Sequence, residues 1–110
     1  MKRLVLVLAA LAAPAAADNP HPHHVAGGWS EVPRAALTAE VGPAARFGVS
    51  KLPAPHAPLA QIIGAERQVV AGTNYRMIVR LKDGKRWRLV VWRKLDGTME
   101  LTWFKPDRQS

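Results

Sequence analysis

Few side chains in this sequence are of the types that carry out catalysis. The 110 residues include no cysteine, and the four histidines stand at positions 21, 23, 24 and 56, all within proline-rich segments. A serine or cysteine nucleophile needs a base that is held firmly against it, and such segments do not provide that support. There is no Gly-x-Ser-x-Gly elbow or phosphate-binding glycine loop, and the eight carboxylates are scattered. We therefore expect a protein that is not an enzyme and that uses no cofactor.

His21, His23 and His24 form the cluster that is best suited to bind a metal. Neutral imidazole is a common ligand of transition metals, and capture of a metal ion by this cluster is one interpretation. A specific site also needs fixed geometry and supporting hydrogen bonds around its ligands. Segment 18–26 carries almost no apolar side chain to bury, so we expect it to be a flexible arm without a metal site.

A short apolar run that ends in glycine is the most informative binding motif. Gln68-Val69-Val70-Ala71-Gly72 completes a hydrophobic strand pattern, and a sheet can present such a run to a partner as a small apolar loop. In an unrelated protein the same five residues would more often be an ordinary strand end. The elements that flank the run must decide between these interpretations.

Residues 1–17 have the pattern of a secretory signal peptide. Lys2 and Arg3 precede an apolar run and a small-residue cleavage site that ends at Ala17. The apolar run is shorter than the roughly 20 residues that a membrane-spanning helix needs. We expect cleavage after Ala17 and export to a periplasm or to the outside of the cell, with no attachment to a membrane after cleavage.

The rest of the chain, residues 27–110, is expected to form one small domain. It has no disulfide to stabilise it, so its hydrophobic core must suffice. Removing Lys2 and Arg3 changes the balance of 16 basic and 8 acidic side chains to 14 and 8, a net charge of +6. This charge favours acidic partner surfaces. Nucleic acid is not expected as the partner of an exported protein.

Residues 37–52 show a helical pattern. Pro43 is compatible with it only in the first turn, and Phe47 and Val49 are expected to face the core. Gly48 weakens a helix by about 1 kcal/mol relative to alanine. We interpret it as a position where the helix packs closely on a sheet.

The remaining residues predict an antiparallel sheet. Residues 59–71 form one long strand, and residues 75–81 and 87–91 carry apolar side chains at odd-numbered positions. Placing both sets on one face requires a hairpin loop of odd length, which we predict as Asp83-Gly84-Lys85 with a bulge. A second hairpin at Asp96-Gly97 leads to a strand whose core-facing residues are predicted to be Met99, Leu101 and Trp103. The expected fold class is α+β, with about four antiparallel strands wrapped around one helix.

The opposite face of this sheet is predicted to be basic. The same register places these residues on it: Arg76, Arg80, Lys82, Arg86 and Arg88, with Ile78, Val90 and Trp92 among them. Basic side chains beside an aromatic ring can bind a nucleic acid strand or an acidic surface. They can also form a solvated face whose long stems cover apolar groups, which is the interpretation we favour because no nucleic-acid-binding motif is present.

Four landmarks in order resemble the cystatin family. They are Gly27-Gly28 before Trp29, Ala44-Ala45-Arg46-Phe47-Gly48-Val49, the stretch from Gln68 through Gly72 to Tyr75, and Glu100-Leu101-Thr102-Trp103-Phe104-Lys105-Pro106. The resemblance covers almost the whole chain after residue 17. It is closest to the disulfide-free, plant-type cystatins, whose helix carries a similar Ala-Arg-Phe-Ala-Val run. The family inhibits papain-like cysteine proteases, so such a protease is the expected partner.

The resemblance also implies a protease-binding wedge that fills the active-site cleft without reacting with the catalytic cysteine. Carried onto this chain, its residues are Gly27, Gly28, Gln68, Val69, Val70, Ala71, Gly72, Lys94, Leu95 and Asp96, with Gly97 closing the second loop. The family usually carries Pro-Trp in the second loop, whereas this chain reads Arg93-Lys94-Leu95-Asp96-Gly97. A large aromatic anchor is therefore missing, and Leu95 stands in part in its place.

Two functions remain open at this point. The first is an exported, noncovalent inhibitor of papain-like cysteine proteases. The second is a non-inhibitory binding module of the same fold that engages an acidic partner through the basic face. We expect a monomer, with a domain-swapped dimer as the alternative, because a long strand before a tight loop can act as a hinge.

Overall fold

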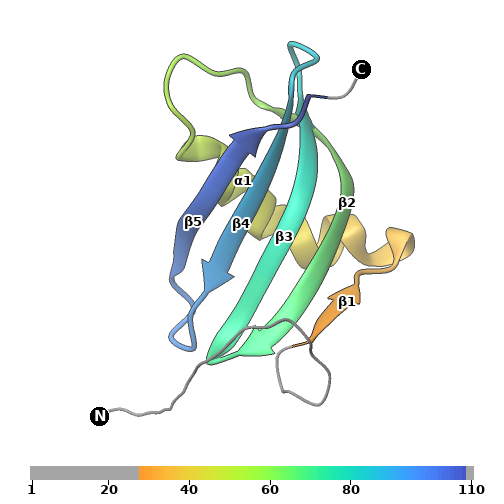
Figure 1. Ribbon diagram of the computed structural model, residues 1–110, viewed down its shortest axis with the longest axis vertical. Helices are drawn as coiled ribbons and strands as arrows, with labels where there is room; N and C mark the ends of the chain where they lie inside the picture. The colour runs from red at the N-terminus through yellow and green to blue at the C-terminus, as the bar shows by residue number, and fades with distance from the viewer. Residues whose placement is uncertain (1–27, 109–110) are drawn as a thin grey trace.

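The computed structural model describes residues 28–108, which form a five-stranded antiparallel sheet with a helical layer on one face (Figure 1). The expected signal peptide, the arm 18–26 and Gly27 lie outside the described residues. The elements in chain order are β1 (Trp29–Glu31), a 3-10 turn (Arg34–Ala36), a π-helical turn (Leu37–Val41), α1 (Gly42–Ser50), β2 (Leu59–Val70), β3 (Gly72–Leu81), β4 (Arg86–Arg93) and β5 (Met99–Pro106). None of the helices in this part of the chain is long and apolar enough to cross a membrane.

The α+β architecture predicted from the sequence is confirmed, with one strand more than expected. The strands neighbour one another in chain order, β1-β2-β3-β4-β5. The additional strand, β1, is three residues long and pairs with β2 through Trp29↔Gln68 and Glu31↔Glu66. Three residues are too few to show the alternation by which a strand is recognised in a sequence.

The helical segment starts earlier than predicted and changes its winding along its length. A 3-10 turn at residue 34 and a π-helical turn at residue 37 lead into α1. Pro43 lies in the first turn of α1, as predicted, where the fixed φ of proline suits a helix. The predicted start at residue 37 therefore lies inside one continuous helical path.

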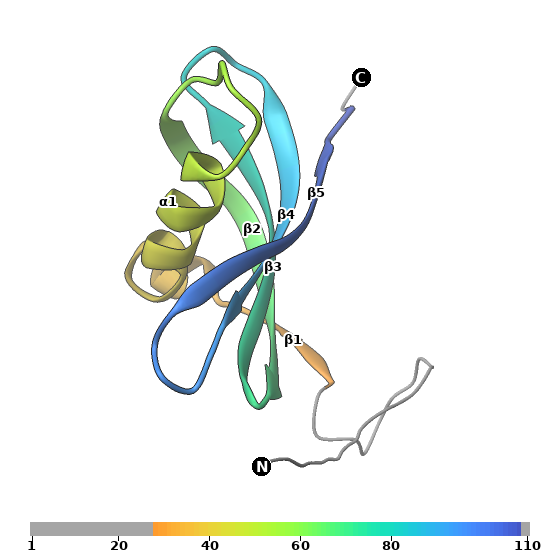
Figure 2. The same cartoon turned by 90° about the vertical axis from the view of Figure 1, so that its left-hand side faces the viewer.

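Close packing of α1 on the sheet explains Gly48. A Cβ at this position would lie 2.9 Å from Val91 Cγ2 and 3.0 Å from Leu89 Cδ1, which confirms the predicted close approach. Val49 is buried and Phe47 packs against the edge of the core. Figure 2 shows α1 lying across one face of the sheet. The core between these layers consists of Val32, Leu37, Val41, Ala44, Ala45, Val49, Leu52, Ala65, Tyr75, Met77, Val79, Leu81, Leu89 and Val91.

The hairpin between β3 and β4 has the predicted odd length but begins one residue earlier. The Leu81 N–H donates to the Lys85 carbonyl at 2.8 Å, and the Gly84 N–H donates to the Leu81 carbonyl at 2.9 Å. The loop is therefore residues 82–84, and Gly84 is its last residue, with φ +88°. Because that position needs a positive φ, the glycine sets the loop, and Lys85 pairs with Leu81 instead of lying within the turn. Odd positions of both strands face α1, as predicted.

The prediction that Trp103 faces the core is wrong. A register shift in the β4–β5 pair places Trp103 opposite Val90 and Leu101 opposite Val91, so Thr102 is an extra residue. Such a bulge moves every later side chain to the other face. Met99 and Leu101 pack against the core, whereas Trp103 is 47% exposed.

Candidate functional site

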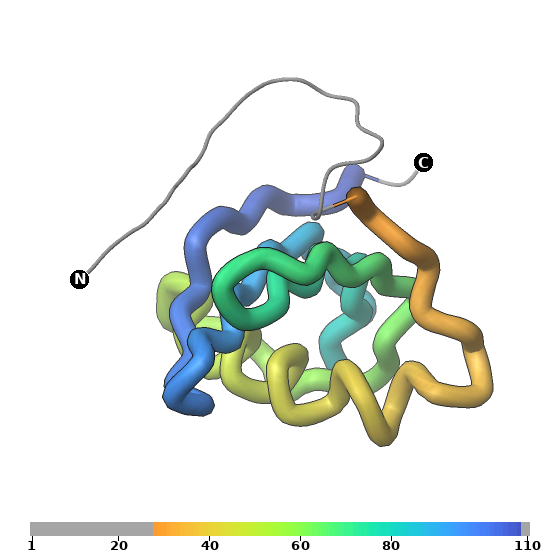
Figure 3. Tube along the Cα trace, turned by 90° about the horizontal axis from the view of Figure 1, so that it is seen from below, coloured from red at the N-terminus to blue at the C-terminus, as the bar shows by residue number. Residues whose placement is uncertain are grey.

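Both hairpin loops predicted to bind a partner lie at one end of the molecule, where β1 also begins (Figures 1 and 3). Gly28 adjoins the end of β2 because Trp29 pairs with Gln68. We call this end, comprising Gly28, residues 68–72 and residues 94–97, the loop edge. The structure therefore brings together the predicted site residues that it describes, and Gly27 lies outside its range.

The loop edge is apolar at its tips. Leu95 is 83% exposed, Val69 60% and Val70 41%. They are three of the five large exposed hydrophobic side chains in residues 28–108, and the other two lie on β5. These exposed tips offer apolar contact to a partner.

The first loop packs directly on the end of β4. The β2–β3 ladder closes with the pair Val70↔Gly72, which leaves Ala71 alone at the apex. Gly72 has φ +95°, and a Cβ there would lie 2.2 Å from the Arg93 carbonyl oxygen and 3.1 Å from Lys94 Cα. Only glycine meets both conditions. The two loops are therefore in backbone contact.

Two side-chain hydrogen bonds brace the first loop. Asn74 Nδ2 donates to Gln68 Oε1 at 3.0 Å, and Trp92 Nε1 donates to the Ala71 carbonyl at 2.9 Å. Gln68, a predicted contact residue, is therefore engaged at the base of the loop. Trp92 was not among the predicted site residues, and its outward-facing position in β4 was the only signal in the sequence that pointed to it.

The second loop is closed by its own hydrogen bonds. The Lys94 N–H donates to the Thr98 carbonyl at 2.8 Å, and the Gly97 N–H donates to the Lys94 carbonyl at 2.9 Å. The Asp96 carboxylate accepts from the Thr98 hydroxyl at 2.7 Å and from the Thr98 N–H at 2.9 Å. These bonds hold the pKa of Asp96 below its ordinary value. Asp96 thus braces the loop, while Leu95 is left pointing outward.

Lys94 joins the second loop to the strands behind it. Its Nζ lies 3.4 Å from Glu100 Oε1 and 5.2 Å from the centre of the Trp92 ring. A cation over an indole face is attracted to the ring. Lys94, another predicted contact residue, is therefore partly directed toward the protein itself.

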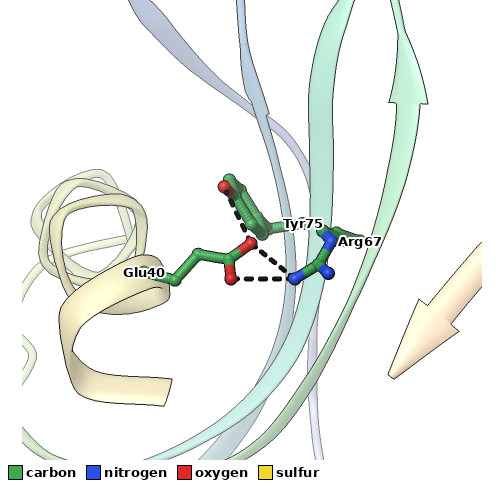
Figure 4. Close-up of polar contacts among 3 residues, drawn as sticks. All are labelled: Glu40, Arg67 and Tyr75. Atoms are coloured by element: carbon green, nitrogen blue, oxygen red, sulfur yellow. Dashed lines mark hydrogen bonds and ion pairs between the residues drawn. The ribbon is translucent and has the colours of Figure 1, made fainter. Parts of the chain in front are cut away.

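A partly buried polar network of Glu40, Arg67 and Tyr75 ties the helical segment to the sheet (Figure 4). Arg67 Nη1 lies 2.8 Å from both carboxylate oxygens of Glu40, and the Tyr75 hydroxyl donates to Glu40 Oε2 at 3.4 Å. Burial raises the pKa of Tyr75 while the nearby Arg93 opposes the shift, so the hydroxyl stays protonated as a donor. This network could not be predicted from local spacing, because Arg67 and Tyr75 are 27 and 35 residues from Glu40 in the chain.

Carboxylates neutralise part of the positive charge on the outer face of the sheet. Arg76 pairs with Glu66, while Arg86 and Arg88 lie 3.2 Å and 3.0 Å from the carboxylate of Asp107. Three of the five basic residues predicted on this face therefore have a carboxylate partner. A groove of about 600 Å³ crosses the face, with Gly64, Ile78, Val90 and Trp103 among its lining residues. Within residues 28–108 no group of three or more histidines and carboxylates could hold a metal ion.

No family model matches this chain, but comparison with known proteins gives a relative that is similar in sequence. Cysteine proteinase inhibitor 1 from Actinidia chinensis var. chinensis is 37% identical over 75 residues. The match covers 63% of this chain and 64% of that protein, so the chain spans just under two thirds of the relative's length. By its name, the relative is an inhibitor of a cysteine proteinase. This match confirms the resemblance that the four sequence landmarks indicated.

Proposed function

The chain is related to the cystatin family in sequence and has a cystatin-like fold, and from this premise we propose that it inhibits papain-like cysteine proteases by noncovalent occlusion of the active-site cleft. The observation that carries the proposal is the loop edge, where Val69, Val70 and Leu95 project at one end of the molecule. Gly27 and Gly28 would extend the same edge. No group at this edge would react with the catalytic cysteine.

The exposed apolar side chains of the loop edge would supply a large part, but not all, of the binding free energy of a micromolar inhibitor. Full burial of one valine or leucine side chain contributes about 1.5–3 kcal/mol. Because the two valines are partly covered already, the three anchors together would contribute on the order of 5 kcal/mol. A micromolar complex needs about 8 kcal/mol, so backbone contacts of the loops and of Gly28 would have to supply the remainder.

The second loop sets the expected strength of inhibition. It presents Leu95 where the family usually has Pro-Trp. Tryptophan hot spots contribute at least about 2 kcal/mol, so an inhibitor without one is expected to bind roughly thirtyfold more weakly. Leu95, 83% exposed, offers part of the lost apolar contact.

We further propose that the protein is exported and acts outside the cytoplasm. Support comes from the basic residues, apolar run and small-residue site in residues 1–17. The target is proposed only as a class, the papain-like cysteine proteases.

The direct test is inhibition of papain by the purified protein without residues 1–17, titrated at constant substrate and physiological salt. The proposal expects a dissociation constant at or below about the micromolar range, corresponding to about −8 kcal/mol or stronger. A folded protein that does not inhibit at far higher concentrations would contradict the proposal.

Two substitutions test the geometry of the wedge. Val69→Asp places a charge on an exposed tip, and Gly28→Glu places one beside the end of β2, so each should raise the inhibition constant at least about thirtyfold. Neither residue is part of the core, so circular dichroism and thermal unfolding should stay near wild type. Lys85→Glu, next to the hairpin loop at the opposite end, changes charge as a control and should inhibit normally. If both edge variants inhibit like wild type, the wedge is not the binding surface.

A further inference from the structure

We propose that Trp92 is a positioning residue that locks the first loop to the second and thereby protects the Ala71–Gly72 peptide bond from the protease. The inference rests on the proposed function, because it concerns how the loop edge enters a protease cleft without being cleaved there. It adds to that function a residue outside both loops.

The indole holds the first loop where the sheet can no longer do so. Trp92 stands on β4 opposite Asn74, and the β2–β3 ladder ends at the pair Val70↔Gly72. Ala71 lies beyond the last pair, at the exposed apex. The 2.9 Å hydrogen bond from Trp92 Nε1 fixes the Ala71 carbonyl at this point.

The same side chain contacts the second loop. Lys94 Nζ lies 5.2 Å from the centre of the Trp92 ring, and the Lys94 N–H closes the second loop on the Thr98 carbonyl. Gly72 meanwhile packs against the Arg93 carbonyl. Trp92 is therefore in contact with the apex of one loop and the base of the other, and it keeps them in one arrangement.

The bonded carbonyl belongs to the peptide bond that a protease would attack at the apex. To hydrolyse Ala71–Gly72, a protease must polarise the Ala71 oxygen with its own donors. Water then adds across the bond, leaving a carboxylate on Ala71 and an amine on Gly72. In this structure that oxygen accepts a hydrogen bond from Trp92 and is directed at β4. We call this hydrogen bond the lock. The protease can polarise the Ala71 oxygen only after the lock breaks.

The lock also lowers the cost of binding. A loop that is already ordered loses little conformational freedom when a partner surrounds it. Without the indole N–H, the apex gains conformations in which it fits the cleft as an ordinary substrate. Loss of the lock should therefore weaken inhibition and turn the first loop into a cleavage site.

The experiment compares the purified wild-type protein with Trp92→Phe and Trp103→Phe. Trp92→Phe keeps a ring for Lys94 but removes the donor to Ala71, and Trp103→Phe changes another outer-face tryptophan away from the loop edge. Trp92→Phe should raise the inhibition constant for papain about fivefold, the factor of one ordinary hydrogen bond. Prolonged incubation should cut it between Ala71 and Gly72, as read by mass spectrometry. Trp103→Phe should behave like wild type in both assays.

The two readouts separate the positioning role from a structural one and from the proposed function. Global unfolding would expose many bonds to papain, whereas an open lock exposes one, so the mapped cleavage sites distinguish them even if Trp92→Phe is less stable. If wild type does not inhibit, the proposed function fails, but selective cleavage of Trp92→Phe at Ala71–Gly72 still supports the lock. Equal resistance of Trp92→Phe and wild type to cleavage at this bond would overturn it.

Discussion

Three glycines with positive φ close the three hairpin loops, and their surroundings differ. Gly84 and Gly97 have φ +88° and +90° with open space where a Cβ would lie, whereas at Gly72, φ +95°, the Arg93 carbonyl oxygen stands 2.2 Å from that point. Each glycine relieves backbone strain, but only Gly72 also permits contact between two loops. Gly72 is therefore the glycine on which the shape of the loop edge depends.

Replacing these glycines by alanine should separate the two effects. Gly84→Ala places alanine in a left-handed backbone conformation and should lower the free energy of unfolding by about 1–2 kcal/mol. Inhibition should stay unchanged. Gly72→Ala must also displace the Arg93 backbone, so we expect a further loss of about 1–3 kcal/mol and clearly weaker inhibition. Urea denaturation and papain titration measure both. Equal behaviour of the two variants would show that the loops do not depend on close contact at Gly72.

The individual residues of the loop edge could be predicted in position but not in role. The apolar pattern and the glycine of residues 68–72 were sufficient to predict a loop tip, and Val69 and Val70 are exposed there. Gln68 and Asp96 were predicted as contacts, yet Asn74 and Thr98 engage their side chains. Local spacing does not reveal which of several polar neighbours a side chain will bond, because that depends on strand pairing.

At the scale of elements, α1 and the sheet approach each other through Gly48. A Cβ added at Gly48 would lie 2.9 Å from Val91 Cγ2 and 3.0 Å from Leu89 Cδ1, whereas a Cβ added at Gly64 in β2 would have no atom within 4 Å. The first glycine is thus required by helix–sheet packing and the second is not.

Alanine substitution at these two sites provides a matched test of element packing. In Gly48→Ala the gain in helix propensity of about 1 kcal/mol competes with an overpacking cost of about 1–3 kcal/mol. Because Val91 Cγ2 has little freedom to move, we expect net destabilisation of about 1 kcal/mol. Gly64→Ala should lie within about 0.5 kcal/mol of wild type. The midpoints of chemical denaturation report both, and a more stable Gly48→Ala protein would show that the helix can retreat from the sheet.

The order and faces of the elements followed from alternation in the sequence, and the exceptions have a common cause. Odd positions of β3 and β4 face the core as expected, but the bulge at Thr102 turns Trp103 outward. Nothing in Met99, Leu101 and Trp103 marks a break in the pattern, because the bulge is decided by how β5 pairs with β4. Strand β1, with three residues, is too short to show alternation, and its pairing with β2 is what defines it.

At the scale of the whole molecule, charge and apolar surface are located in different places. The chain has a formal net charge of +8, yet Glu66 and Asp107 lie within ion-pairing distance of three arginines on the outer face. The exposed tips Val69 and Leu95 lie at the loop edge instead. Screening by salt acts on exposed charges and hardly at all on apolar contacts. The two candidate surfaces therefore predict different responses to ionic strength.

Binding through the loop edge should show a salt-dependent association rate and a nearly salt-independent dissociation rate. Net charge alters the rate of encounter with a charged protease, whereas the lifetime of the complex depends on buried contacts. Between low and high salt we expect the dissociation rate constant to change by less than about twofold, as measured by biosensor kinetics on papain.

Lys105→Gln removes a charge on β5 opposite the outer-face residue Arg88, and it should change the association rate without shortening the lifetime of the complex. The outer face would lie inside the interface if the dissociation rate constant rose about tenfold with salt. The same would follow if this substitution shortened the lifetime of the complex. In that case the second function considered from the sequence, binding of an acidic partner through the sheet, would replace occlusion by the loop edge. The dissociation rate therefore distinguishes the two functions even if both surfaces contribute to the speed of encounter.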